Sequence, residues 1–191
     1  MSDGFFALAH RMKYIERWSL MRNTARENIA EHSFFVALIS HALAAIRRDV
    51  YEIPCDPTRA VTYAIFHDMS EIFTGDLPTP IKYYNPKIRT AYHEIEEVSK
   101  GRLLAALPDE LQGEYRAAAN PDEEYSVLVK AADKLSAYIK CIEERNAGNA
   151  EFIIAERQTL TALTEMAMPE IDYFIEHFIP SFSLTLDELE R

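Results

Sequence analysis

The sequence predicts an all-α fold, a helical bundle of about six to nine helices. Apolar residues recur at three- and four-residue spacing along most of the chain, and the alternating runs typical of strands are missing. Glycine is scarce, with 5 among 191 residues, which disfavours turn-rich β folds and flexible linkers. Since no repeat, low-complexity tract or linker interrupts the pattern, residues 1–191 are predicted to form a single domain.

The first two helices are predicted at about residues 5–15 and 29–48. A loop-like stretch around residues 19–23 separates them. The second is long, and one face carries the apolar spacing expected of a helix that packs on a core. This expected core face comprises Phe35, Leu38, Ile39, Ala42 and Ile46.

The third helix has readable ends. Asp56 suits the N-cap, Pro57 suits the first helical position, and Gly75 lies just past the predicted end. Pro78 and Pro80 then break the helical pattern. Further helices are predicted at 86–107, shortly after Pro108, from Asn120–Pro121 to Gly148, at 152–166, at 170–178 and over 184–191.

Charge and cysteine content narrow the class of function. A net charge of −11 argues against long nucleic acids as partners, because no basic excess is available to neutralise phosphates. A small phosphorylated ligand stays possible, since one cation and one or two arginines suffice to bind it. Cys55 and Cys141 show no CxxC spacing, which fits a reducing cytosol. Neither a signal peptide nor an apolar run long enough for a membrane span is evident.

Four side chains of the metal-ligand type interrupt otherwise apolar helical patterns: His32, the adjacent pair His67 and Asp68, and Asp133. Taken alone, each has a simpler interpretation. Asp133 would face solvent or pair with Lys130 or Lys134, and either histidine would be a cap or a satisfied core residue.

The other histidines provide a contrast. His41 lies on the same predicted helix as His32, but nine residues later, about 180° around the helix axis. Both side chains therefore cannot face one site. We assign His41 to packing or to the surface, and likewise His10, His93 and His177.

In combination, the four candidates indicate a metal centre. Two imidazoles and two carboxylates suit a divalent ion such as Mn, Co, Fe, Ni or Zn, and their formal charge of −2 balances it. A set without cysteine that leaves open coordination positions is typical of catalytic sites. Glu71 lies four residues after His67 on the same predicted helical face, where it could hydrogen-bond water or transfer a proton. Its simpler interpretation is a solvated surface residue.

The order H…HD…D resembles that of the HD-domain metal phosphohydrolases. The wider segments RWSLMRN, ENIAEHS, HDMSEIFTGDLPTP and LVKAADKLSAYIKCIEE resemble the bacterial 5′-deoxynucleotidases of the YfbR type, and the similarity spans nearly the whole chain. The resemblance implies an HD-domain helical bundle with one divalent metal ion (Co, Mn, Zn, Ni, Fe or Cu). It implies a homodimer that hydrolyses deoxyribonucleoside 5′-monophosphates.

The resemblance also assigns roles to residues. It implies that His32, His67, Asp68 and Asp133 hold the metal, and that Glu71, Arg17 and Asp68 are catalytic. Arg17 would orient the phosphate, for which its planar fork is suited. Trp18 would line the sugar pocket and Asp76 would accept the 3′-hydroxyl; the simpler interpretation of Trp18 is a hydrophobic anchor. The full substrate-binding set is Arg17, Trp18, His32, Asp68, Asp76, Leu77, Pro78 and Thr79.

Two other functions remain open from the sequence. One is an HD phosphohydrolase for another nucleotide, a nucleoside triphosphate or a cyclic nucleotide, which the reaction products would distinguish. The other is a non-catalytic helical module that binds a nucleotide or a partner, which a metal-content measurement would distinguish.

Overall fold

The computed structural model describes residues 3–82 and 84–190, except for the side chain of Thr79. Within these ranges the fold is all-α, as predicted, and one isolated bridge, Glu16–Asn28, is the sole extended pairing. The helices are α1 (Phe5–Ala9), α2 (Ile29–Asp49), α3 (Pro57–Phe66), α4 (Glu71–Thr74), α5 (Thr79–Lys82), α6 (Pro86–Leu104), α7 (Asp109–Ala118), α8 (Glu123–Asn146), α9 (Ile153–Glu165), α10 (Pro169–His177) and α11 (Leu186–Leu189). Three 3₁₀ segments, η1 (His10–Tyr14), η2 (Ala150–Phe152) and η3 (Ile179–Ser183), complete them.

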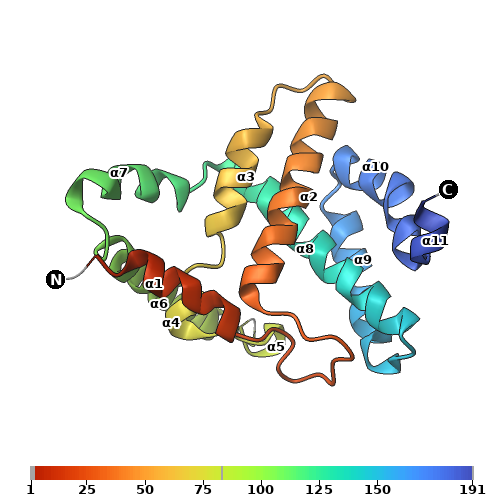
Figure 1. The fold of residues 1–191 in the computed structure, drawn as a ribbon, viewed down its shortest axis with the longest axis horizontal. Helices are drawn as coiled ribbons and strands as arrows, with labels where there is room; N and C mark the ends of the chain where they lie inside the picture. Colours follow the sequence, from red (N-terminus) through yellow and green to blue (C-terminus); the bar gives the residue numbers. More distant parts are fainter. Residues whose placement is uncertain (1–2, 83, 191) are drawn as a thin grey trace.

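The long helices α2 and α8 form the centre of the bundle. They pack against each other, and α3 packs on both. In Figure 1, α1, α4, α5 and α6 gather on one side of this pair and α9, α10 and α11 on the other. α2 begins with a capping box, in which Asn28 and Glu31 satisfy each other's backbone N–H groups.

The predicted core face of α2 is only half right. Ile39 and Ile46 are buried, but Phe35 and Leu38 are each 53% exposed. The core side instead includes Val36 and Leu43, both fully buried. Because apolar residues surround most of α2, periodicity alone does not single out the buried side.

By length and composition, α2 could cross a membrane, and it is the one described helix of which this is true. In the stretch concerned, 56% of the residues are buried inside the structure. The helix packs against α3, α8 and α10, and the core helix of a bundle passes the same test.

The predicted third helix begins as expected but does not run unbroken to Gly75. Asp56 caps α3 by accepting the Thr58 N–H at 2.9 Å. At His67 the backbone turns to three-residue hydrogen bonds, such as Met69 N–H to Phe66 O at 3.3 Å, before α4 starts. The His67 ring contacts the Ala64 carbonyl, which would otherwise accept the Asp68 N–H in a continuous helix. Gly75, with φ +71°, ends α4.

Other boundaries match the sequence within a few residues. α5 occupies a single turn inside the expected break around Pro78 and Pro80. α8 begins after Asp122, whose side chain caps it, rather than at Pro121. Gly148, with φ +85°, follows its end as expected.

The buried apolar residues form two clusters that meet at one polar seam. The larger lies among α2, α3, α8, α9 and α10, and the smaller joins the amino-terminal segment to the end of α6. On α2, Ile29 belongs to the smaller cluster and Val36 to the larger, with His32 between them. Likewise, Ala64 belongs to the larger cluster and Met69 to the smaller. The fold therefore places both histidines, and Asp68 with them, where the two clusters meet.

Candidate metal-centred active site

Three of the four predicted ligands lie together. One ligand atom from each of His32, His67 and Asp68 falls within 4.8 Å of the other two. On His67, Nδ1 lies 2.6 Å from the Ala64 carbonyl oxygen, and on His32, Nδ1 lies 3.2 Å from Ser136 Oγ. When a histidine is held through one ring nitrogen in this way, the other nitrogen is aimed at a ligand.

The donor set fits a divalent cation. Nε2 of both histidines is buried and has no hydrogen-bond partner among the described residues. Yet each faces a carboxylate oxygen at 3.0 Å: Asp133 for His32, and Asp68 for His67. Buried polar atoms are normally satisfied, and a cation shared by these nitrogens and oxygens would satisfy all of them.

Asp133 joins the site from α8. Its Oδ1 lies 3.0 Å from His32 Nε2 and 3.9 Å from Arg17 Nη2, so the simpler pairing with Lys130 or Lys134 is wrong. Its side chain is 41% exposed and lies outside the group of three. Asp133 is thus the candidate ligand that borders the cavity described below.

The charges of the cluster reinforce one another. Burial opposes ionisation of Asp68, but the neighbouring His67 outweighs it and lowers the pKa of the carboxyl to about 2. Partial loss of water around the Asp133 carboxyl group also opposes its ionisation, yet contact with His32 holds its pKa well below the usual range. The pKa of His67 is raised, because the carboxylate of Asp68 outweighs the effect of burial. Both aspartates are therefore ionised at neutral pH.

Glu71 is buried, with 6% of its surface exposed, so its interpretation as a solvated surface residue is wrong. Burial and the nearby carboxylates of Asp68 and Asp76 raise the pKa of Glu71 to about 9. A carboxyl group that gains a proton this readily beside a metal site has the properties of a proton carrier.

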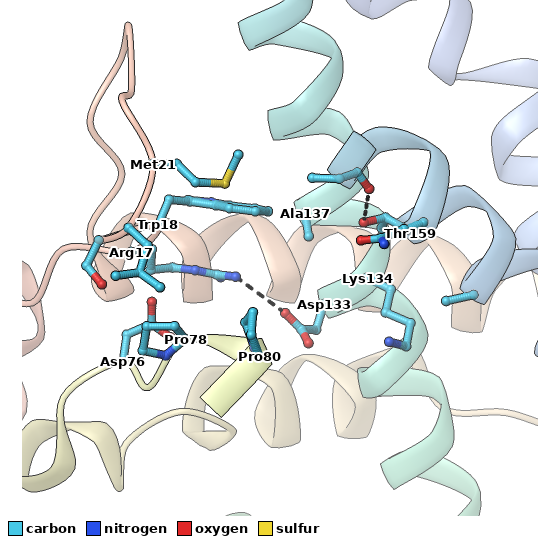
Figure 2. Close-up of a pocket in the computed structure, with 15 residues that line it drawn as sticks. Arg17, Trp18, Met21, Asp76, Pro78, Pro80, Asp133, Lys134, Ala137 and Thr159 are labelled. Atoms are coloured by element: carbon cyan, nitrogen blue, oxygen red, sulfur yellow. Dashed lines mark hydrogen bonds and ion pairs between the residues drawn. The ribbon is translucent and has the colours of Figure 1, made fainter. Parts of the chain in front are cut away.

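A cavity of about 660 Å³ adjoins the cluster. Figure 2 shows Arg17 and Trp18 entering it from one side, Asp133 and Lys134 from α8, and Asp76 with Pro78 below. The lining is completed by Ser19, Leu20, Met21, Pro80, Ala137, Ala155, Gln158, Thr159 and Ala162.

Arg17 is the buried cation of this cavity. Burial disfavours its charged form, but the carboxylates of Asp133 and Glu27 outweigh burial and raise the pKa of the guanidinium. Nε lies 3.5 Å from Glu27 Oε2. Nη1 is buried without a hydrogen-bond partner among the described residues. A buried guanidinium with a free N–H is suited to an anionic ligand.

Trp18 has the packing contact of an anchor and also lines the cavity. Its ring lies 5.3 Å from that of Phe152, as a hydrophobic anchor would, and its side chain also lines the cavity. Nε1 donates a hydrogen bond to Glu27 Oε2 at 3.0 Å. The backbone of Trp18 adopts φ +59°, which is uncommon for a residue other than glycine.

The predicted substrate loop is brought to the cavity only in part. Asp76 and Pro78 line it, and burial raises the pKa of Asp76 although Arg17 opposes this. Leu77 is half-buried and is not among the described lining residues. Thr79 begins α5, and its side chain lies outside the described part of the structure.

The histidines assigned away from the site are found away from it. His10, His41, His93 and His177 are all exposed. This result confirms the helical-phase argument that separated His41 from His32 on the same helix.

Sequence reasoning missed two parts of the site. Glu27 and Ser136 contact His32, Arg17 or Trp18, but an isolated polar residue at such a position carries no distinctive pattern. The α9 wall of the cavity, including Gln158 and Thr159, was also missed. Its spacing is that of any amphipathic helix, so only the three-dimensional structure shows which residues reach the cavity.

A helical bundle that brings an adjacent His–Asp pair to a second histidine and a second aspartate defines an HD-domain phosphohydrolase. Solved structures agree on the fold. An HD-domain phosphohydrolase from Listeria innocua superposes with a TM-score of 0.82 at 22% identity, covering 97% of this chain and 91% of the other. The cyanophage S-2L HD phosphohydrolase DatZ, solved with dA and one catalytic Zn²⁺, gives 0.68 at 22% identity, covering 92% and 96%.

Sequence comparisons narrow the class. The family model "5′-deoxynucleotidase YfbR-like" matches residues 4–182. A 5′-deoxynucleotidase of Vibrio vulnificus is 46% identical over 188 residues, 97% of each chain. One of Yersinia pseudotuberculosis is 48% identical over 97% of this chain and 95% of its own. The chain belongs to the YfbR-like 5′-deoxynucleotidase family, whose members are phosphoric monoester hydrolases.

Proposed function

We propose that this protein hydrolyses deoxyribonucleoside 5′-monophosphates to a deoxynucleoside and phosphate. Membership of the family supports the reaction. The observation that carries the proposal is Arg17: its buried guanidinium lies 3.9 Å from Asp133, and its Nη1 has no hydrogen-bond partner among the described residues. An anion that carries its own oxygens, such as a phosphate monoester, satisfies this atom.

His32, His67, Asp68 and Asp133 are the proposed ligands of one divalent metal ion, which we propose to be Co, Mn, Zn, Ni, Fe or Cu. The orphaned Nε2 atoms of the two histidines support this assignment. When bound, such an ion lowers the pKa of a water molecule and polarises a phosphate oxygen. DatZ, whose fold is similar, was solved with one catalytic Zn²⁺, which supports the proposal of a divalent metal.

The surrounding residues divide the remaining work. Arg17 binds the phosphate and neutralises the charge that develops on the transferring group. Glu71 is assigned the proton of the attacking water: its ionised form accepts this proton, the raised pKa of about 9 lets it hold the proton, and it then passes the proton to the departing 5′-oxygen of the deoxynucleoside. Asp68, which is ionised, holds its negative charge beside both histidines and contributes to catalysis from there.

We assign sugar recognition to Trp18, which follows Arg17, and to the loop that begins at Asp76. Trp18 packs where a ribose 2′-hydroxyl would lie, and Asp76 accepts the 3′-hydroxyl. Pro78 shapes the floor, and we keep Leu77 and Thr79 as the rest of the substrate loop. His32 and Asp68 contact the phosphate end. Lining of the cavity by Trp18, Asp76 and Pro78 supports this arrangement.

The test is phosphate release from the metal-supplemented protein. Each deoxynucleoside 5′-monophosphate is compared with its ribonucleotide and with its 3′-phosphate isomer. We expect release from the deoxy 5′-monophosphates alone. Release of tripolyphosphate from a nucleoside triphosphate, or opening of a cyclic nucleotide, would instead assign the site to another HD phosphohydrolase reaction.

We further propose that the protein is a homodimer and acts in the cytosol as a single HD domain. Phe34, Phe35 and Leu38 support the dimer, because they lie together on α2 and are more than half exposed. The two free cysteines support a reducing compartment. Light scattering on the wild type and on a Phe35→Ser/Leu38→Ser variant tests the dimer, and an unchanged monomer mass in both would refute it.

A further inference from the structure

The loop that carries Arg17 and Trp18 is closed at its base by two backbone hydrogen bonds. Arg17 N–H donates to Glu27 O at 2.9 Å, and Ile29 N–H donates to Ile15 O at 3.0 Å. This short ladder sets Glu27 directly opposite Arg17. The Glu27 side chain is 15% exposed and turned into the site.

One carboxylate then contacts three functional side chains. Oε2 of Glu27 accepts the Trp18 Nε1–H at 3.0 Å and lies 3.5 Å from Arg17 Nε. Oε1 lies 3.8 Å from Nδ1 of His32, beyond hydrogen-bond distance but on the same side of the ring as Ser136.

The contact between Glu27 and Arg17 determines which nitrogen atoms of the guanidinium remain free. Because Nε faces Glu27, the two Nη atoms are directed toward Asp133 and the cavity. The same carboxylate accepts the indole N–H and so holds the ring, which extends across the cavity in Figure 2. The backbone of Trp18 is in a left-handed conformation that L residues seldom adopt. Arg17 and Trp18 thus share one oxygen of Glu27 as a partner.

We infer that Glu27 is a positioning residue that holds Arg17 and Trp18 in one joint orientation and so couples phosphate binding to selection of the deoxy sugar. The coupling to substrate rests on the proposed function, whereas the positioning of Trp18 does not. A charge-assisted hydrogen bond of this kind contributes more than a neutral one. Trp18 makes such a hydrogen bond with Glu27, and Arg17 makes an ion pair with the same oxygen at 3.5 Å, so loss of the carboxylate is expected to be measurable in both side chains.

Trp18 is the only tryptophan of the chain, so its fluorescence reports its position directly. In Glu27→Ala the indole N–H loses its partner, and we expect a shifted emission maximum and stronger quenching by acrylamide. In Glu27→Gln the amide oxygen still accepts the indole N–H, so the spectrum stays close to that of the wild type. The ion pair with Arg17 is lost in both variants.

Kinetic measurements separate the contact of Glu27 with Arg17 from its contact with Trp18. Glu27→Gln is expected to raise KM for deoxynucleoside 5′-monophosphates roughly tenfold, because Arg17 loses the ion pair that orients its guanidinium, with a smaller change in kcat. Glu27→Ala is expected also to narrow the deoxy-to-ribo ratio of kcat/KM. In a double-mutant cycle with Trp18→Phe, which removes the same indole N–H, the two effects on that ratio should not add.

Glu16 supplies the matched control. It is exposed, precedes Arg17 directly, and loses the same charge in Glu16→Gln; we expect wild-type fluorescence and kinetics. Equal thermal stability and metal content across the variants show that the fold is intact. Unchanged Trp18 fluorescence in Glu27→Ala, or additive effects in the cycle, would overturn the inference. If the wild type releases no phosphate, the fluorescence result still decides the positioning role while the proposed function fails separately.

Discussion

Nδ1 of His67 lies 2.6 Å from the carbonyl oxygen of Ala64, three residues earlier in the chain. The contact occupies a carbonyl at the end of α3 and at the same time turns Nε2 toward Asp68, 3.0 Å away. One hydrogen bond therefore ends the helix and fixes the ring orientation needed to bind a metal.

Replacing this ring should remove the metal. We expect His67→Ala to lose bound metal and activity together, because only His32, Asp68 and Asp133 of the four proposed ligands would remain to hold the ion. Metal analysis of the purified protein measures the first effect and phosphate release the second. His41→Ala, at an exposed position on α2, is the control and should match the wild type. Full metal occupancy in His67→Ala would remove His67 from the ligand set.

Glu71→Gln separates proton transfer from metal binding. We expect metal content to be retained and kcat to fall about 10²- to 10⁴-fold, the usual contribution of a positioned acid or base. The amide keeps the size of the side chain but cannot carry the proton. Full turnover by Glu71→Gln would refute the assigned role.

Trp18→Ala tests sugar selection. Opening the cavity beside Arg17 should admit the ribose 2′-hydroxyl and narrow the deoxy-to-ribo ratio of kcat/KM by roughly tenfold or more, the scale of a steric contact in a specificity pocket. Steady-state kinetics on matched deoxy- and ribonucleotides give the ratio. Should the ratio stay constant, Trp18 would be an anchor on Phe152 alone.

Glu144, on α8, anchors the loop that carries Arg17 and Trp18. Its carboxylate is 1% exposed and accepts hydrogen bonds from Thr24 and Ala25 of the loop and from Asn149, and it pairs with Lys140. We expect Glu144→Gln to lower the free energy of unfolding by about 3–5 kcal/mol, because it leaves the Lys140 ammonium buried without a counter-ion. Urea denaturation measures the change, with exposed Glu94→Gln as the control.

The contribution of Glu144 to the free energy of unfolding should decrease as the pH falls. Burial alone would raise its pKa, but the hydrogen bonds from Lys140 and Asn149 hold it far below the ordinary value. Its contribution to stability is therefore complete above the pKa of the unfolded chain, about 4.3, and is lost as pH falls toward the folded-state pKa. The stability difference between wild type and Glu144→Gln should shrink between pH 6 and pH 3, measured by denaturation at each pH. A constant difference would contradict this linkage.

Sequence alone singled out the candidate ligands because their chemistry is conspicuous. His32, His67 and Asp133 stand out as polar residues in apolar helices, and helical phase correctly excluded His41. The break after Phe66 was missed, since it results from a contact between the His67 side chain and the backbone of Ala64 rather than from a breaker residue.

Other features depend on tertiary packing and carry no local signal. The sequence could not predict that Phe35 and Leu38 are exposed, because α2 is apolar on most sides. Glu27 sits opposite Arg17 only because the intervening loop closes on itself, and no sequence periodicity encodes that closure.

The two sides of the cavity come from different parts of the sequence. Every group assigned to the metal, the phosphate or the sugar precedes Lys134, whereas α9 contributes the opposite wall through Ala155, Gln158, Thr159 and Ala162. Substitutions on α9 can therefore reshape the far end of the cavity without displacing a single reacting group. Such a separation lets the shape of that end change, by evolution or by engineering, while the groups proposed to carry out hydrolysis stay in place.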